Sequence, residues 1–380
     1  MIKLSRQKWV SVLLSFLMII SPIMGLFTFG ATPALAGLTL GPEINLTPNG
    51  VQRASHTNPA IYGQKIVWQD DRNGNLDIYM KDLATGVESQ VVSNTTDQYE
   101  PAIFGHRVVW VDIRNGGNPD IYMKDLTTGI ESAVVSNGSI QEQPSLHGDT
   151  LVWTERSNYW GPSEVYRKNL VTGVVNKLPG GYGAASVDVW GHWTTWHEPN
   201  RGGVWAKNLI SGWTGRVNSN SISAASSYMT PAVYNDMIVW DQHDSQAGIY
   251  TKNMTTNVES KISNGSDQLN PDIFGDNVVW EDSRTSPSMI YLKNLTTGVG
   301  GQLTSSGTQQ YRPAIYGNIV VWQDNRNGTP DIFMKNLSTG VVTQVNSNQS
   351  FIGADQFHGD IDGNKVVWVD NRWNAPGLYY

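Results

Sequence analysis

The chain of 380 residues contains no cysteine. Disulfide bonds, thiolate metal sites and cysteine nucleophiles are therefore excluded. Charged residues make up only 16% of the sequence, and the formal net charge of −7 at pH 7 is spread along the chain rather than gathered in one run. Because no basic stripe is available to contact phosphates, nucleic acid is not an expected partner.

Long apolar runs are also lacking, except at the N-terminus. There Lys3, Arg6 and Lys8 precede the apolar run 10–29, and the small-residue site Ala34-Leu35-Ala36 follows. This order is typical of an export signal. We expect residues 1–36 to be a cleaved signal peptide and the mature protein to be extracytoplasmic (secreted, periplasmic or cell-surface), without stable membrane insertion. A retained anchor is the alternative, because the run is long enough to span a bilayer.

A repeat is present throughout the rest of the chain. It is marked by a tryptophan preceded by β-branched residues, and the copies are 40 to 46 residues apart. The eight anchor tryptophans are Trp68, Trp110, Trp153, Trp196, Trp240, Trp280, Trp322 and Trp368. This period is within the range of propeller blades. The 38 glycines and 17 prolines suit many short strands joined by tight turns.

Each of the first seven copies contains four short segments, which in the first copy are residues 59–63, 65–70, 77–83 and 88–92. Between the second and third segments lies a sequence with Asn73-Gly74, a pair that readily adopts the positive φ angles of a hairpin turn. Both faces of the second segment carry apolar residues, as expected for a strand buried between neighbouring sheets. The repeat therefore predicts four-stranded antiparallel blades.

The two ends of the chain suggest how a ring of such blades closes. The last copy stops after its third strand, whereas residues 43–47 lie ahead of the first copy where a fourth strand belongs. An N-terminal strand that completes the C-terminal blade would remove open sheet edges. We expect an all-β fold in which residues 37–380 form a single eight-bladed β-propeller closed in this way, with seven blades as the alternative.

Residues 69–79 and 323–333 resemble the blade signature of TolB-like propellers of bacteria and archaea. The resemblance covers the whole mature chain. It implies protein interaction in the periplasm or at the cell surface, but fold does not fix activity. In related peptidases the propeller is joined to an α/β-hydrolase domain, and this sequence contains no Gly-x-Ser-x-Gly nucleophile elbow.

Polar residues stand ten positions before every anchor tryptophan, at the start of the expected innermost strand. They are Asn58, Glu100, Gln143, Ser186, Thr230, Asn270, Arg312 and His358. We expect them to ring the mouth of the central channel, on the face with the longer loops. All except Ser186 are our candidate ligand-binding residues. Three interpretations stay open: a wet channel mouth, a site for a small polar ligand or ion, and a surface for a partner protein.

An aspartate two residues after the anchor is followed by an arginine in five copies, for example Asp70 with Arg72 and Asp370 with Arg372. Repetition favours a structural role, in which a charge-assisted bond holds the hairpin or bridges neighbouring blades. Oxygen side chains at alternate positions (Asp71, Asn73, Asn75 and Asp77) make calcium an alternative. We otherwise expect no cofactor, because the hairpin explains the pattern and the features of an EF-hand loop are missing.

Aromatic residues stand in two loops between second and third strands, where the repeat requires no apolar contact: Tyr159, Trp160 and Trp373. Exposed aromatics suit stacking on sugars or contact with a partner, although packing over neighbouring loops is an equal alternative. The histidine pairs His56 with His358 and His197 with His243 could act as acid and base or bind a metal.

The favoured function is a non-enzymatic binding or scaffolding module that engages a protein or glycan of the cell envelope, because the candidate groups are mostly repeated. No catalytic residue and no metal ligand is assigned. The alternative is a polysaccharide lyase or glycosidase that uses His358, His56, Glu100 and Arg312 near the channel.

Overall fold

The computed structural model describes residues 56–379, apart from 83, 180–182, 200–201, 220–228, 285, 306, 327–330, 345–355, 364 and 371–376. The expected signal peptide, the closing strand at 43–47 and Trp373 lie outside the described residues. The described part of the chain contains 31 strands in eight antiparallel sheets, seven of four strands and one of three. No helix in that part is long and apolar enough to cross a membrane.

The strands follow one another in the order of the repeat. The first three sheets contain β1 (His56–Tyr62), β2 (Lys65–Asp70), β3 (Asp77–Asp82) and β4 (Glu88–Val92); β5 (Gln98–Phe104), β6 (Arg107–Asp112), β7 (Asp120–Asp125) and β8 (Glu131–Val135); and β9 (Ile140–His147), β10 (Thr150–Arg156), β11 (Glu164–Asn169) and β12 (Val175–Lys177). The next two contain β13 (Ala185–Trp190), β14 (Trp193–Glu198), β15 (Gly203–Asn208) and β16 (Thr214–Arg216); and β17 (Ala232–Tyr234), β18 (Met237–Gln242), β19 (Gly248–Asn253) and β20 (Val258–Lys261). The last three contain β21 (Gln268–Phe274), β22 (Asn277–Asp282), β23 (Met289–Asn294) and β24 (Gly300–Gln302); β25 (Gln310–Tyr316), β26 (Ile319–Asp324), β27 (Asp331–Asn336) and β28 (Val342–Gln344); and β29 (Gln356–Asp362), β30 (Lys365–Asp370) and β31 (Gly377–Tyr379).

The second strand of each sheet is buried on both faces, as the repeat predicted. In β2, Trp68 packs with Val367 and Val369 of the last sheet. Val67, on the opposite face of the strand, packs with Trp110 of the second sheet. Each sheet is therefore held between its two neighbours by apolar contacts, and burying a side chain of this size stabilises the fold by roughly 1.5 to 3 kcal/mol.

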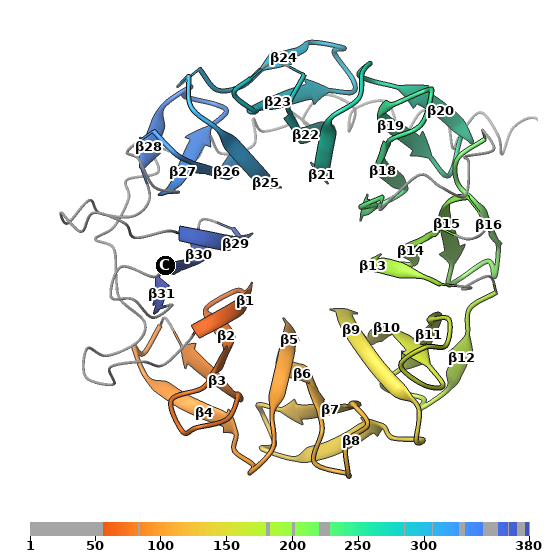
Figure 1. Ribbon diagram of the computed structural model, residues 1–380, viewed down its shortest axis with the longest axis vertical. Coiled ribbons are helices and arrows are strands. Elements are labelled where there is room, and N and C mark those ends of the chain that lie inside the picture. Colours follow the sequence, from red (N-terminus) through yellow and green to blue (C-terminus); the bar gives the residue numbers. More distant parts are fainter. Residues whose placement is uncertain are drawn as a thin grey trace, which may run out of the picture. The chain divides into compact units, whose positions relative to one another are not determined.

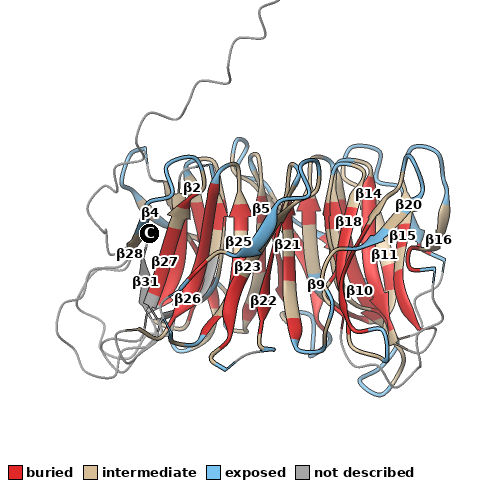
Figure 2. Ribbon diagram, turned by 90° about the horizontal axis from the view of Figure 1, so that it is seen from above, coloured by how far each residue is buried: buried red, intermediate tan, exposed pale blue. Residues whose placement is uncertain are grey.

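The sheets are arranged around a common axis, with each first strand innermost and each last strand outermost (Figure 1). Successive first strands contact one another from β1 to β29, and β29 in turn contacts β1. Seen from the side, buried strands form the middle layer between two layers of exposed connections (Figure 2).

The two faces differ in their connections. On the face that we call the turn face, first and second strands are joined by tight turns such as Gly63-Gln64, where Gly63 has a φ of 59°. Glycine adopts a left-handed φ of this kind without steric strain. The opposite face, here called the loop face, carries the longer connections from second to third strands and from each sheet to the next.

Ring-bearing side chains at the last position of the first strands form a continuous series on the turn face. Its members are Tyr62, Phe104, His147, Trp190, Tyr234, Phe274 and Tyr316. Centroids of neighbouring rings are 4.4 to 5.0 Å apart, and the planes are inclined by 39° to 47°. We call this set the aromatic series.

Candidate functional site

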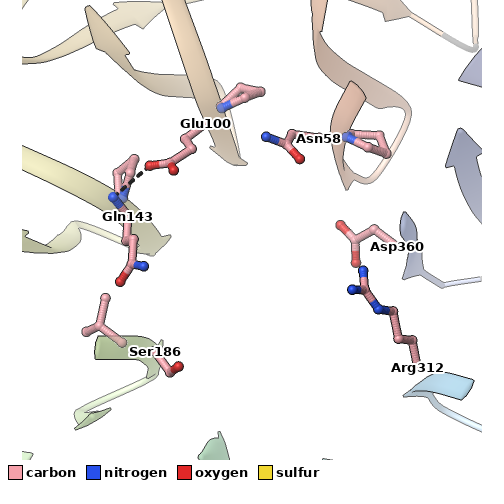
Figure 3. Close-up of a pocket in the computed structure, with 10 residues that line it drawn as sticks. Asn58, Glu100, Gln143, Ser186, Arg312 and Asp360 are labelled. Atoms are coloured by element: carbon pink, nitrogen blue, oxygen red, sulfur yellow. Dashed lines mark hydrogen bonds between the residues drawn. The ribbon is translucent and has the colours of Figure 1, made fainter. Parts of the chain in front are cut away.

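A cavity of about 610 Å³ lies at the loop-face end of the first strands (Figure 3). Five of the polar residues expected at the channel mouth line it: Asn58, Glu100, Gln143, Ser186 and Arg312. The remaining lining residues are Pro59, Pro101, Pro144, Val187 and Asp360. The sequence position ten residues before each anchor therefore brings side chains from several sheets to one cavity.

The mouth residues share an unusual backbone conformation. Asn58, Glu100, Gln143, Ser186, Asn270 and Arg312 all have φ between 49° and 53°. At each of them the pairing between the first and second strands shifts register, which is the geometry of a β-bulge. A left-handed backbone costs a residue other than glycine about 1 to 2 kcal/mol. Strain that recurs in six copies is a feature of the mouth, and strained residues of this kind cluster at functional sites.

Side chains of the mouth connect neighbouring sheets. The Oε1 atom of Gln69 accepts hydrogen bonds from Asn58 Nδ2 at 2.9 Å and from the amide of Glu100 at 3.1 Å. Glu100 Oε2 in turn accepts the amide of Gln143 at 2.8 Å (Figure 3). Burial raises the pKa of Glu100, which the bond from Gln143 opposes and the charge of Glu142 reinforces.

The same arrangement recurs farther round the ring. Glu281 Oε2 accepts bonds from Asn270 Nδ2 at 3.2 Å and from the amide of Arg312 at 3.4 Å. Burial raises the pKa of Glu281. Asn270 is thus part of the bonded rim, although it is not among the residues that line the cavity.

Two mouth candidates differ from the others. Thr230 precedes β17 and donates both its amide and its hydroxyl to Asp241 Oδ1, at 2.6 and 3.2 Å. His358 belongs to β29, but its side chain lies outside the described residues, as does that of His56 in β1.

Three aspartates farther along the first strands were not anticipated: Asp188, Asp272 and Asp360. Their Oδ2 atoms accept backbone amides of the following sheet, from Val233 at 3.1 Å, Ile315 at 2.8 Å and Ile61 at 3.1 Å. The signal in the sequence was an acid eight residues before the anchor in alternate copies, where four other copies have alanine.

The three carboxyl groups titrate abnormally because they are enclosed by the first strands. Burial raises the pKa of Asp272 to about 7 and that of Asp360 to about 6, and it also raises the pKa of Asp188. The charges of Asp188 and Asp360 add to the effect on Asp272, so these carboxylates interact with one another. The interior of the ring therefore contains carboxyl groups that keep their protons to a higher pH than aspartate ordinarily does, and Arg312 lines the same cavity as Asp360.

The Asp–Arg pairs have the structural role predicted for them. In the second sheet, Asp112 accepts bonds from Trp110 Nε1 at 3.0 Å and from the backbone amide of Arg114 at 2.9 Å. Arg114 also bonds Glu131 of β8 and lies 4.1 Å above the ring of Tyr122. Equivalent pairs join Asp70 to Arg72, Asp282 to Arg284 and Asp324 to Arg326. They hold the hairpin of one sheet, and Arg284 also donates to the carbonyl oxygen of Asn264, in the connection that follows the fifth sheet, at 2.6 Å. The pair of Asp370 lies partly outside the described residues.

The suggested calcium ligands hold the first hairpin. Asn73 Nδ2 donates to Asp77 Oδ2 at 2.9 Å, and Asn75 Nδ2 donates to the carbonyl oxygens of Asn94 and Thr96 at 3.0 and 2.8 Å. In the described part of the chain, no three histidine, aspartate or glutamate side chains are grouped to share a metal ion.

The pair His197 and His243 meets at Asp241. His243 Nε2 is 3.1 Å from Asp241 Oδ2, and this hydrogen bond raises the pKa of His243. Burial lowers the pKa of His197 to about 4, and its Nδ1 accepts the amide of Met229 at 3.3 Å. His197 therefore bonds the connection that leads into the fifth sheet, and His243 is held within the fifth sheet.

The aromatic loop candidates are exposed on the loop face. Trp160 is 97% exposed and Tyr159 is 57% exposed. The hydroxyl of Tyr159 is directed at the carbonyl oxygen of Gly117 in the neighbouring loop, at 3.4 Å, and Arg156 lies 5.5 Å from its ring. Tyr159 thus packs over a neighbouring loop, whereas Trp160 projects into solvent.

Solved structures share this arrangement of sheets. The β-propeller domain of the Trilobed protease from Pyrococcus furiosus is 10% identical, with a TM-score of 0.53 over 87% of this chain and 94% of its own. The chain has a β-propeller fold. The computationally designed Ika8 protein is 15% identical, with a TM-score of 0.62 over 87% of this chain and 98% of its own.

A third similar structure is the oligogalacturonate lyase from Vibrio parahaemolyticus, which is 15% identical, with a TM-score of 0.54 over 76% of this chain and 92% of its own. No protein-family model and no curated protein matches the sequence. At these identities the likeness concerns the propeller fold alone, since one fold hosts many functions.

Proposed function

We propose that this propeller is an exported, non-enzymatic binding module of the TolB-like type, which engages a protein or glycan of the cell envelope through its loop face. The observation that carries the proposal is Trp160, an almost fully exposed tryptophan on the same face as the polar cavity. A tryptophan in water leaves a large apolar area unburied, and tryptophan is the residue most enriched among the energetically dominant contacts of interfaces. Stacking on a sugar ring would use the same surface.

The use of the mouth groups favours binding over catalysis. Gln69, Glu100 and Glu281 accept amides across sheet boundaries, so they fix the shape of the rim. A rigid rim with exposed polar side chains such as Asn58, Gln143 and Arg312 suits a small polar ligand or the polar part of a partner. The alternative, a lyase or glycosidase, depends on His56 and His358, whose side chains lie outside the described residues.

We also propose eight blades closed by residues 43–47. Inclinations of 39° to 47° between successive rings of the aromatic series are close to about 45°, one eighth of a turn, whereas seven blades require about 51°. A contact that recurs at lysines of the third strands supports the proposal of a closing strand. Lys124, Lys168, Lys252, Lys293 and Lys335 each donate to a carbonyl oxygen next to the outer edge of the preceding sheet. Lys81 holds this position beside the last sheet, where a strand at 43–47 would supply the acceptor.

Replacing Trp160 by alanine tests the binding face. Wild-type protein is screened on a glycan array and against fractionated envelope proteins, and the affinity of each ligand found is then measured for the variant. Because a buried tryptophan contact contributes about 2 kcal/mol or more, we expect the affinity to fall by about 30-fold.

The matched control is Ile210→Ala. Ile210 is 83% exposed and lies in the turn between β15 and β16, on the turn face. The Ile210→Ala variant should bind each ligand as tightly as the wild type does. Equal affinity of Trp160→Ala and wild type for every ligand would remove the loop aromatic from the proposal, and equal losses in both variants would place the contact elsewhere.

A further inference from the structure

The outer turns of the turn face carry exposed apolar side chains. These turns join third to fourth strands, and in seven copies an apolar residue at the end of the turn is 43% to 71% exposed. The residues are Val87, Ile130, Val174, Trp213, Val258, Val299 and Val341. Because the sheets surround a common axis (Figure 1), these side chains follow the rim of the turn face. We call them the apolar rim.

The third and fourth copies add further apolar residues in the same turns. Val171 is 68% exposed and Ile210 is 83% exposed. The turn requires neither side chain: the amide of Val171 donates to Asn169 Oδ1 at 3.0 Å, and the same bond joins Thr255 to Asn253 Oδ1 in the fifth copy. At this position five other copies have Ala84, Thr127, Thr255, Thr296 and Ser338. Exposed apolar side chains that gather where the fold does not require them mark a surface for interaction.

The charges beside these two turns suit an anionic surface. Lys168 and Lys207 precede Val171 and Ile210 by three residues. In both copies the lysine is followed by asparagine, whereas the first two copies have an aspartate there. The aspartates of the nearby turns between first and second strands are each bonded to a basic side chain, Asp149 to Arg107 and Asp236 to His192.

The proposed closure places the start of the propeller on the turn face. Fourth strands follow the outer turns, so they run from the turn face to the loop face. A strand at 43–47 that completes the last sheet would run in the same direction, and the residues before 43 would leave the ring at the turn face. Only 13 residues, 30–42, separate this strand from the apolar run 10–29, and a linker of that length spans at most about 45 Å. The turn face is therefore the side that lies nearest the membrane when the chain is exported.

We infer that the turn face docks peripherally on an anionic lipid membrane, with Val171, Ile210 and Trp213 among the lipid headgroups and Lys168 and Lys207 close to the phosphates. Exposed connections lie at a similar height along each side of the ring (Figure 2), so the tips can meet one plane. A bilayer surface accepts separate apolar tips, and tryptophan is enriched at the boundary between lipid and water. A stable protein interface would instead need a continuous patch of about 800 Å² on each partner. The inference rests on the proposed export and closing strand, and it leaves the loop face open to its ligand.

Cosedimentation of the mature protein, residues 37–380, with lipid vesicles tests the inference. Vesicles of phosphatidylcholine and phosphatidylglycerol at about 2:1 should bind the protein about tenfold more tightly than vesicles of phosphatidylcholine alone, because two lysines lie next to the inserted tips. The double variant Val171→Thr, Ile210→Thr should bind the mixed vesicles at least about tenfold more weakly. Threonine stands at this position in three other copies, so the variant should keep the fold.

Trp160→Ala is the matched control, because it removes an exposed apolar side chain from the loop face, and it should bind vesicles as tightly as the wild type does. The double variant should keep its affinity for the loop-face ligand, which separates this inference from the proposed function. A polarity-sensitive dye on Thr172→Cys should shift to shorter emission wavelengths when mixed vesicles are added, and the same dye on Ser157→Cys should not. Absence of vesicle binding by the wild type, undiminished binding by the double variant, or a shift at residue 157 alone would overturn the inference.

Discussion

Replacing Asp112 by alanine is expected to lower the free energy of unfolding by about 3 to 5 kcal/mol. The Asp112 carboxylate is fully buried and accepts bonds from Trp110 Nε1 and from Arg114. Alanine would leave the indole N–H of Trp110 without its acceptor. It would also leave the guanidinium group of Arg114, which is largely buried, without its main counter-charge. Burial lowers the pKa of Arg114, but the bonds and charges of Asp112 and Glu131 outweigh burial and raise it. Because an arginine side chain is not deprotonated in proteins, Arg114 would stay charged in the variant, with Glu131 as its remaining carboxylate partner.

Urea unfolding of both proteins at neutral pH measures this difference. The control is Asp149→Ala, because Asp149 pairs with Arg107 while its own side chain is 51% exposed. A pair of that kind contributes about 1 kcal/mol or less. If Asp112→Ala cost no more than Asp149→Ala, the buried carboxylate would not be the group that holds the hairpin.

The second large effect concerns pH. The native pKa of Asp272 is about 7, whereas an aspartate in an unfolded chain titrates near 3.9. Between about pH 4 and pH 7 the native state therefore holds a proton that the unfolded state has released, and the contribution of Asp272 to stability falls as the pH rises. From pH 5 to pH 8 the loss is about 2 kcal/mol. Asp360, with a native pKa of about 6, acts in the same direction.

Asp272→Ala isolates this contribution. The two neighbouring copies have Ala232 and Ala314 at the same position, so alanine suits the strand. Histidines also titrate in this window. Burial lowers the native pKa of His197 to about 4, so the contribution of His197 to stability falls as the pH falls. The quantity to measure is thus the difference in unfolding free energy between variant and wild type at pH 5 and at pH 8. We expect the variant to gain about 2 kcal/mol relative to wild type over this range, and a difference independent of pH would contradict the raised pKa.

The sequence predicted the sheets well because the repeat gives the same strand eight independent times. A tryptophan with β-branched neighbours on both faces, as at residues 66–68, has few stable environments other than a strand between two sheets. The pairs of Asp112 with Arg114 and of its equivalents were predicted for the same reason. Their spacing of two residues places both partners at the beginning of one hairpin.

The candidate site was harder to predict, because it depends on backbone geometry and on differences between copies. The polar side chains of Asn58 and Gln143 indicated that these residues lie at the channel mouth. Their bulged backbone with positive φ could not be predicted, because several residue types occur at this position. Asp272 was missed because most copies have alanine or serine there, and a search for shared residues passes over it. The aromatic series was missed because four residue types, Tyr, Phe, His and Trp, share its position, and a search for one shared residue passes over it.

Single-cysteine labelling tests most directly the claim that partners bind through the loop face, since the natural sequence has no cysteine to interfere. Ser157→Cys places a thiol next to Trp160 on the loop face, and Thr256→Cys places one in the exposed turn between β19 and β20 on the turn face. Each is coupled to a bulky maleimide polymer, and the affinity for the envelope ligand is measured before and after coupling. We expect coupling at residue 157 to abolish binding and coupling at residue 256 to leave it unchanged; the reverse pattern would place the binding surface on the turn face.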